Sequence, residues 1–280
     1  MKIRIITDSA SDMPAVHRPE VAVLSMTVTF GAEEFQDGIN LTYHQFYEKL
    51  IEGEDLPTTS QISPSQFEEV FQAAVDAGET VVAVVLSAKL SGTYQSACIA
   101  AEEFPGQVFV VDSANATLGE LVLVERAVEL MDQGLDAAAI AARLEEEKKE
   151  VRLVGLLDTL EYLKRGGRVS ASVALVGGLL AIKPVVAVQD GEVVVLGKAR
   201  GSKNGNNLLV QEIQKTGVDF SRPYKLGYAG LNDSLLQKYI ADSAALWEGQ
   251  ADSLPTGTVG GTIGTHVGPG AIAVAFFRKS

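Results

Sequence analysis

Cysteine is almost absent from this sequence of 280 residues, in which Cys98 is the single example. One thiol cannot close a disulfide within the chain or build a cysteine metal cluster. Because Cys98 lies in an apolar stretch with a helical pattern, we expect a small buried side chain rather than a reactive thiol. Neither a metal ion nor a cofactor is expected.

Long hydrophobic runs are also missing. The apolar run at residues 3–6 is too short for a signal peptide, and the longest nearly uncharged stretch covers only residues 171–182. A membrane-spanning helix needs about 18 or more consecutive apolar residues. We therefore expect a cytoplasmic protein without stable membrane insertion.

Positive charge is scarce, because 23 lysines and arginines face 36 aspartates and glutamates, for a formal net charge of -13. Such a surface repels phosphate backbones and anionic lipid headgroups, so nucleic acid is not an expected partner. Lys164, Arg165 and Arg168 form a local basic exception. Basic residues followed by glycine fit the end of a helix, and Arg168 is also a candidate contact for an anion or a partner protein.

Two motifs that would define an enzyme class are absent. There is neither a Walker phosphate-binding loop nor the glycine spacing of a dinucleotide site after the first predicted strand, which argues against a nucleotide site. There is also no Gly-x-Ser-x-Gly turn of the kind that presents a serine nucleophile in many acyl hydrolases.

What the first half does contain is a repeated alternation of strands and helices. This pattern predicts an α/β fold whose mainly parallel sheet is covered by helices on both faces. At about 150 residues per domain, the length favours an N-terminal α/β domain at residues 1–150 and a second domain at residues 151–280. The predicted strands are 3–6, 21–30, 80–86 and 107–111, and the predicted helices are 43–51, 65–77, 93–103, 118–132 and 136–149.

The second half mixes hairpins with helices, which predicts a C-terminal α+β domain with a mixed sheet. Asp190 and Gly191 separate two of its strands and indicate a β-hairpin. Residues 173–182 are almost wholly apolar, and we expect a buried helix or, alternatively, the wall of a narrow hydrophobic tunnel. The predicted strands are 151–157, 185–188, 193–198, 224–228 and 271–277, and the predicted helices are 160–164, 206–214 and 234–247.

Loops rich in hydroxyl groups follow the strands of the first half, where ligands bind in a doubly wound sheet. These loops are residues 7–12, 58–61, 87–93 and 112–113. Each could serve only to cap the following helix. Together with the free N–H groups of helix N-termini, however, they indicate a seat for an anion such as a carboxylate. Thr59 and Ser91 are the candidate donors, and Gly92 would let the backbone approach the ligand closely.

His266 is the one histidine in a suggestive setting. It lies in residues 260–270, whose density of glycine and proline predicts a shaped loop from which a histidine can reach a pocket. A structural role explains His266 equally well. Ser91 and His266 could also be a nucleophile and its base, although no acidic residue adjoins His266 in sequence. We expect His17 and His44 to be surface residues.

Several segments in order along the chain together resemble the DegV family. They are TDS at 7–9, TTSQ at 58–61, LSGTYQSA at 90–97, VDS at 111–113, TLEYLKRGGR at 159–168, KP at 183–184 and GTHVGPG at 264–270. The resemblance spans roughly residues 3–277. One departure is Ala88 within Ser87-Ala88-Lys89, where many relatives have a second serine.

The resemblance implies a non-catalytic protein with a long-chain fatty acid held between its two domains. In such relatives it is the acyl-binding subunit of a fatty-acid kinase, which presents the carboxylate to a separate ATP-dependent kinase for acyl-phosphate formation. By motif, Thr59, Ser91 and Gly92 would hold the carboxylate, His266 would assist, and Arg168 would lie near the mouth or partner face. The alternatives are an acyl hydrolase or transferase using Ser91 and His266, and a carrier of another amphipathic anion.

Overall fold

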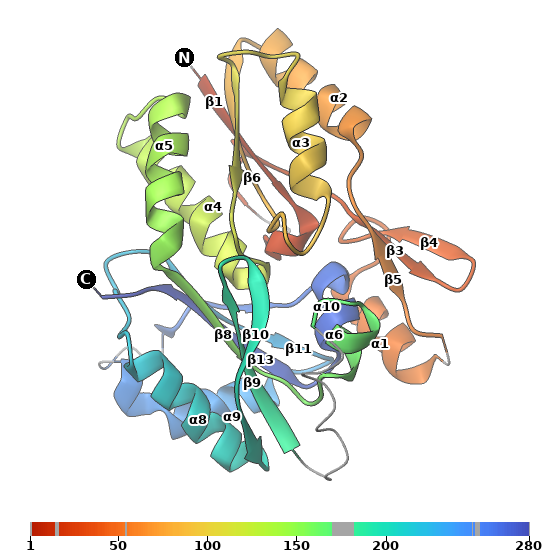
Figure 1. Cartoon of the computed structure of the whole chain (residues 1–280), viewed down its shortest axis with the longest axis vertical. Helices are drawn as coiled ribbons and strands as arrows, with labels where there is room; N and C mark the ends of the chain where they lie inside the picture. The colour runs from red at the N-terminus through yellow and green to blue at the C-terminus, as the bar shows by residue number, and fades with distance from the viewer. Residues whose placement is uncertain are drawn as a thin grey trace.

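The computed structural model describes residues 2–14, 17–53, 55–169, 182–247, 249 and 253–279. Its strands form a four-stranded sheet, a six-stranded sheet and a small three-stranded sheet. Figure 1 shows the four-stranded sheet in the upper half of the molecule and the six-stranded sheet in the lower half, with the three-stranded sheet projecting to one side.

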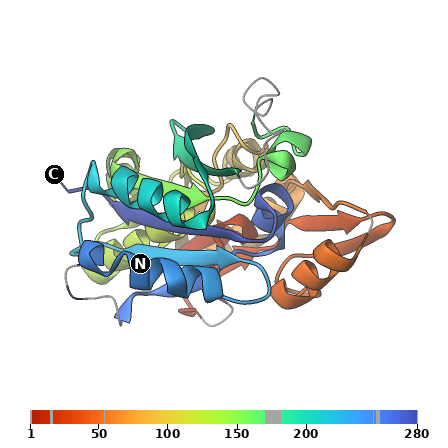
Figure 2. The same cartoon turned by 90° about the horizontal axis from the view of Figure 1, so that it is seen from below.

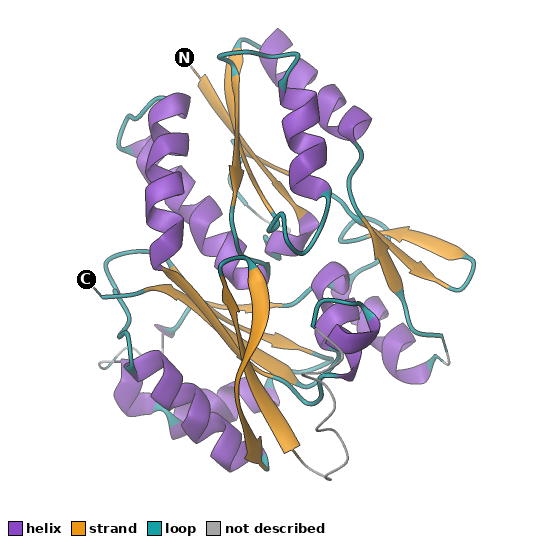
Figure 3. Cartoon of the chain, viewed as in Figure 1, coloured by secondary structure: helices purple, strands orange, loops and turns teal. Residues whose placement is uncertain are grey.

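The four-stranded sheet is parallel throughout and runs in the order β2-β1-β6-β7. Its strands are β1 (Lys2–Asp8), β2 (Val21–Leu24), β6 (Glu79–Val85) and β7 (Val108–Asp112). Two helices pack on each face (Figure 3), namely α2 (Pro64–Asp76) and α3 (Thr93–Ala101) on one face, and α4 (Thr117–Asp132) and α5 (Ala137–Glu147) on the other.

The start of α2 is specified locally. Ser63 and Gln66 form a reciprocal capping box, and Pro64 occupies the first helical turn, where its missing N–H is harmless.

The six-stranded sheet is mixed and runs in the order β10-β9-β8-β13-β11-β12. Only β11 and β12 pair in parallel. Its strands are β8 (Val151–Leu156), β9 (Ile182–Gln189), β10 (Glu192–Arg200), β11 (Tyr224–Ala229), β12 (Thr256–Thr258) and β13 (Ala271–Phe277). Helices α8 (Ser202–Gln214) and α9 (Ser234–Asp242) cover one face (Figure 2), and α4 lies against the other.

The hairpin of β9 and β10 turns at Asp190 and Gly191, which both have positive φ, at 50° and 82°. This is the conformation that a two-residue hairpin turn of type I′ requires.

The three-stranded sheet joins distant parts of the chain. Strands β4 (Glu33–Gln36), β3 (Thr27–Phe30) and β5 (Thr58–Ser60) are antiparallel in that order, and α1 (Tyr43–Glu52) packs beside them. Helix α10 (Gly261–Val267), although close to the C-terminus, packs against α1, β3 and β5, and α6 (Glu161–Arg165) packs against α10. Short 3-10 turns complete the fold at Ser9–Ser11, Lys148–Glu150 and Ala244–Trp247.

The prediction of an α/β fold with one parallel and one mixed sheet is confirmed. The division of the chain near residue 150 stays a prediction. It is compatible with the strands, since β7 ends at Asp112 and β8 begins at Val151. The apolar segment 173–182, apart from Ile182, lies outside the described residues.

Two sequence-based boundaries are wrong for identifiable reasons. Residues 21–30 are not one strand, because Ser25 donates to the Asp37 carbonyl at 2.8 Å and Met26 N–H donates to Ser9 Oγ at 3.0 Å. These bonds divert the chain from the parallel sheet into the small one. The helix expected at 234–247 ends at Asp242, where the Tyr239 carbonyl accepts from both the N–H of Ser243, at 2.9 Å, and its hydroxyl, at 2.6 Å.

Three local expectations are also corrected. Residues 58–60 form a strand rather than a loop, because they pair with β3. Residues 261–267 form a helix rather than a loop, because tertiary contacts override the poor helix propensity of glycine. Cys98 is half-buried rather than buried, and it lies beside Tyr94 on α3.

In the described part of the chain, no helix combines the length and the apolar character needed to cross a bilayer. The same residues contain no cluster of three or more His, Cys, Asp and Glu side chains arranged to hold a metal ion.

Candidate ligand-binding site

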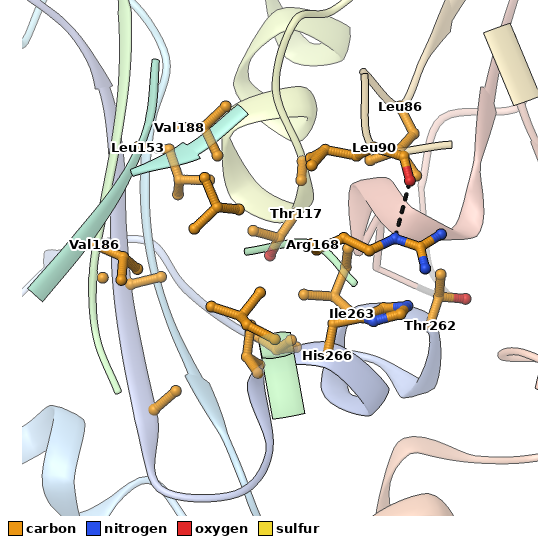
Figure 4. A pocket seen from close by; sticks show the side chains of 18 of the residues that line it. Leu86, Leu90, Thr117, Leu153, Arg168, Val186, Val188, Thr262, Ile263 and His266 are labelled. Carbon is orange, nitrogen blue, oxygen red and sulfur yellow. Dashed lines mark hydrogen bonds between the residues drawn. The ribbon is translucent and has the colours of Figure 1, made fainter. Parts of the chain in front are cut away.

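A cavity of about 220 Å³ lies between the mixed sheet, the loops of the parallel sheet and α10. Most of its lining is apolar. The polar lining residues are Thr59, Gln61, Ser91, Thr117, Arg168, Thr262 and His266. Figure 4 shows Arg168, Thr262 and His266 at one end of the cavity, and Leu153, Val186 and Val188 on the sheet at the other. The cavity thus has a polar end and an apolar end.

The apolar end follows from strand alternation. Successive side chains of a strand point to opposite faces, so Leu153, Gly155 and Leu157 face the cavity from the β8 segment. Val154 and Leu156 point to the other face, under α8 and α9. One face of the sheet is therefore free to line a cavity while the other is covered by helices.

The polar end depends on one contact between distant segments. Thr59 on β5 and His266 on α10 meet with 3.0 Å between Thr59 Oγ1 and His266 Nε2. The two residues are separated by 207 positions in sequence. The small sheet and α10 together bring them to the same wall of the cavity.

The surroundings of His266 define which ring nitrogen carries the proton. Nδ1 is buried and has no hydrogen-bond partner among the described residues, and a Cβ atom built on Gly166 would lie only 2.2 Å from it. An unpaired buried N–H group is rarer than an unpaired acceptor. We therefore assign the proton to Nε2, which donates to Thr59 Oγ1. The Thr59 hydroxyl proton is then available to donate into the cavity.

Burial, and to a smaller extent the nearby Arg168 cation, lowers the pKa of His266 from 6.5 to about 4. The imidazole is consequently neutral near pH 7. The neutral ring adds no charge to the cavity, and its hydrogen bond with Thr59 orients the Thr59 hydroxyl.

Helix α10, which carries His266, is held at its N-terminus by two aspartates, of which Asp37 is buried and Asp12 is half-buried. Asp37 accepts hydrogen bonds from Gly261 N–H at 3.0 Å and from Thr262 N–H at 2.8 Å. Asp12 accepts from Gly260 N–H at 2.7 Å. These bonds satisfy backbone donors that have no partner within the helix, and the carboxylates complement its dipole.

The glycines of α10 are required by close packing. A Cβ atom on Gly264 would lie 2.5 Å from Phe46 Cε1 and 2.8 Å from Tyr47 Oη. The Tyr47 hydroxyl also donates to the Val259 carbonyl at 3.0 Å. Helix α1 can thus seat its aromatic rings on the glycine side of α10, while His266 faces the cavity.

Ser91 lines the cavity from the loop before α3. Its hydroxyl lies 3.0 Å from Thr93 Oγ1 and accepts from Thr93 N–H at 3.2 Å. Gly92, which has no side chain, occupies the N-cap position of α3, so the Ser91 hydroxyl binds the first N–H of that helix from one residue further out. Ser91 thus contacts the start of the helix and also lines the cavity, and its role in binding a ligand stays a prediction.

Gly92 also lines the cavity, but the sequence argument for it needs revision. A Cβ atom on Gly92 would lie 2.1 Å from Gln61 Oε1. The space left by the missing side chain is thus taken by Gln61, whose amide also donates to Ser96 Oγ at 3.2 Å. Gly92 allows the close approach of a protein side chain at this site.

Arg168 joins the segment after α6 to the loop that carries Ser91. Its Nε donates to the Leu90 carbonyl at 3.1 Å, and its Nη1 donates to the Gly166 carbonyl at 2.5 Å (Figure 4 marks the first of these). The half-buried guanidinium lines the cavity and places a permanent positive charge at its polar end.

The acidic groups beneath the polar end have perturbed pKa values. Burial raises the pKa of Asp8 to about 6, against the opposing effect of N–H donors from Leu86 and Ala10. Burial also raises the pKa of Asp12 and Glu120 well above their usual range, and it raises the pKa of Asp37. In all four groups the largest cause is burial, which disfavours the charged form.

The structure brings together all five predicted site residues around one cavity: Thr59, Ser91, Gly92, Arg168 and His266. The sequence analysis missed Asp37, Thr262 and the packing role of Gln61. The Gln61 position was visible in the hydroxyl-rich segment 58–61, but nothing in the sequence indicates that Asp37 binds the start of a helix more than 200 residues away.

The hydrogen bonds described for Ser91 and His266 do not join these two residues to each other. His266 Nε2 is bound to Thr59, and the Ser91 hydroxyl pairs with Thr93. Gly166 abuts Nδ1, where the third member of a triad would bind. His17 and His44 are exposed, as expected for surface residues.

The fold and site describe an α/β protein that encloses an apolar cavity with an uncharged hydrogen-bonding pair and one arginine at its end. Comparison with known proteins places it in a family: the profile of the DegV family of uncharacterised proteins matches residues 2–279. The chain belongs to the DegV family.

Relatives match along the whole chain. A DegV domain-containing protein from Caldanaerobacter subterraneus subsp. tengcongensis is 33% identical, with 99% of each chain covered. A DegV domain-containing protein from Deinococcus radiodurans is also 33% identical, with 98% of each chain covered.

Solved structures extend the similarity to the fold. A DegV family protein from Thermus thermophilus, described as binding fatty acid, superposes with a TM-score of 0.87 at 32% identity, and both chains are fully covered. A fatty acid binding DegV family protein from Streptococcus agalactiae superposes with a TM-score of 0.86 at 26% identity, also with full coverage.

Proposed function

We propose that this protein binds one long-chain fatty acid in the cavity, with the carboxylate at the polar end and the tail against the mixed sheet. The observation that carries the proposal is the division of a single cavity into a hydroxyl and imidazole end and an apolar end. The Thermus thermophilus and Streptococcus agalactiae proteins, described as binding fatty acids, support the same ligand class.

The energetics suit this ligand. Enclosing about a dozen methylene groups at ~0.8 kcal/mol each contributes on the order of 10 kcal/mol, which is enough to hold a lipid tail away from water. Burying an ionised carboxylate requires donors. The hydroxyl groups of Thr59 and Ser91 are at the polar end to supply them, and Arg168 adds a compensating charge.

We also propose that the bound acid is presented to a separate ATP-dependent kinase, which forms the acyl phosphate. Thr59, Ser91 and His266 offer the carboxylate a neutral hydrogen-bonding site without a nucleotide site beside it. The exposed Lys164 and Arg165 of α6 adjoin Arg168 near this end of the cavity and offer a basic surface for the partner.

The first experiment is native mass spectrometry of the purified protein, followed by denaturing extraction and identification of the lipid. We expect one fatty acid per chain, retained from the expression host or taken up from solution. A purified protein that contains no fatty acid and also fails to take up added fatty acids would contradict the proposal.

The second experiment separates the carrier role from catalysis. The loaded protein is mixed with ATP and a purified fatty-acid kinase subunit, and acyl phosphate is trapped with hydroxylamine. We expect hydroxamate only when all components are present. Turnover of an acyl ester by the protein alone, abolished in Ser91→Ala, would instead favour the acyl hydrolase or transferase.

A further inference from the structure

Four paired residues form a row across neighbouring strands of the mixed sheet, and three of them line the cavity. Gly155 on β8 pairs with Val186 on β9 and with Ala273 on β13. Ala273 in turn pairs with Gly227 on β11. All four point to the same face of the sheet, since paired residues in an antiparallel ladder share a face.

The two glycines of this row are there for different reasons. A Cβ atom on Gly227 would lie 2.8 Å from Leu118 Cδ1, so the space above Gly227 is already filled by a side chain of α4. A Cβ atom on Gly155 would have its nearest neighbour, the Ile272 carbonyl oxygen, at 3.3 Å. The Cβ position of Gly155 is thus less crowded than that of Gly227, although Val186 Cγ2 at 3.8 Å and Leu157 Cδ2 at 4.0 Å also border it, and Gly155 lines the cavity whereas Gly227 is covered by Leu118.

Backbone conformation does not explain Gly155 either, because its φ is not positive. Glycine in the interior of a strand weakens the sheet and often marks a place where a ligand approaches the backbone. Gly155 lines the cavity, as do its neighbours Val186 and Ala273.

We propose that Gly155 determines the length of acyl tail that the protein accepts. The missing side chain lets the tail cross β8 between Leu153 and Leu157, close to the backbone, and so admits long unbranched chains. A larger residue at 155 fills this crossing and leaves room only for shorter tails. The inference rests on the proposed fatty-acid binding and adds its selectivity for chain length.

The test is the affinity of the full-length protein for a ladder of saturated fatty acids, for wild type and Gly155→Leu. In the variant we expect the longest acids to bind roughly fifteen-fold more weakly, equivalent to two methylenes at about 0.8 kcal/mol each, and the shortest acids to bind unchanged. Wild type that binds no acid contradicts the proposed function. Wild type that binds, with the same length profile in both proteins, overturns this inference alone.

Gly155→Ala keeps the test valid if the leucine variant does not fold. Its single added carbon should weaken binding of the longest acids roughly fourfold, equivalent to one methylene, with no effect on the shortest. Gly227→Ala is the matched control in the same row. Because its Cβ meets Leu118 rather than the cavity, it should lower thermal stability without changing the length profile. A length shift in Gly227→Ala equal to that in Gly155→Ala would also overturn the inference.

Discussion

The polar end of the cavity is assembled from short segments far apart in sequence, whereas the apolar end is one face of a regular sheet. Thr59, Ser91 and His266 come from a small strand, a loop and a short helix; Thr59 and His266 are held by contacts between distant segments, and Ser91 by hydrogen bonds with Thr93. Leu153 and Val186 need only strand alternation and register to face the cavity. The positions of the side chains at the polar end are thus set by specific contacts. We expect these residues to tolerate substitution far less than the residues of the apolar end.

The largest effect is expected from Thr59→Val, which keeps the shape of the side chain and removes its hydroxyl. Hydrogen bonds to charged groups contribute about 1.5–3 kcal/mol, so fatty-acid affinity should fall roughly 10- to 100-fold. Titration calorimetry of wild type and variant measures this. Thr58→Val is the control, because Thr58 is exposed one position away and should leave affinity unchanged. Equal losses in both variants would contradict the assignment of Thr59 to the site.

The next effect is expected from Gly264→Ala, which tests whether close packing positions α10. The added Cβ would press on Phe46 and Tyr47, and overpacking of this kind destabilises by about 1–3 kcal/mol. Denaturant unfolding should show the loss, together with weaker ligand binding because His266 moves with the helix. Gly257→Ala serves as the control, since its nearest neighbour, Lys225 Cε, would lie at 3.5 Å. If Gly264→Ala is as stable as the wild type, the rings of Phe46 and Tyr47 can move aside, and close packing does not position α10.

A smaller effect is expected from Val186→Ala at the apolar end. Losing contact equivalent to about one methylene, ~0.8 kcal/mol, should weaken binding roughly fourfold. The same calorimetric titration measures it against Thr59→Val. A loss from Val186→Ala as large as that from Thr59→Val would remove the contrast between the two ends.

The smallest effect concerns pH. The pKa of His266 is about 4, below its ordinary value of 6.5, because of burial. Above pH 6.5 the ring is neutral in both folded and unfolded chains, so His266 makes stability independent of pH there. Between pH 6.5 and 4 the unfolded chain binds the proton first, and stability should fall as pH falls. The His266 ring resonances in NMR should stay constant from pH 8 to about 5.5; a midpoint near 6.5 would contradict burial of the neutral ring.

Much of the fold was predictable because its elements carry local signals. The Asp190-Gly191 turn is found where the sequence indicates it, and the helix predicted at residues 65–77 is α2. The alternating strands and helices predicted the parallel sheet. The errors fall where tertiary contacts compete with local preference, as at Ser25 and in the glycine-rich α10.

The candidate site was predictable only in part. Thr59, Ser91, Gly92, Arg168 and His266 could be selected by residue type and by family resemblance, and they line one cavity. Their partners could not be selected. Asp37 looks like an ordinary loop aspartate until the fold places it under Gly261 and Thr262.

The sequence by itself determined most of the elements, the fold class and the family, because hydrophobic periodicity, caps and turns act over a few residues. Only the tertiary structure decided that Thr59 would meet His266 and that Gly155 would line the cavity while Gly227 faces Leu118. Those outcomes depend on packing between segments more than a hundred residues apart. No local pattern encodes such distances, and a glycine that makes room for a ligand has the same letter as one that makes room for a leucine.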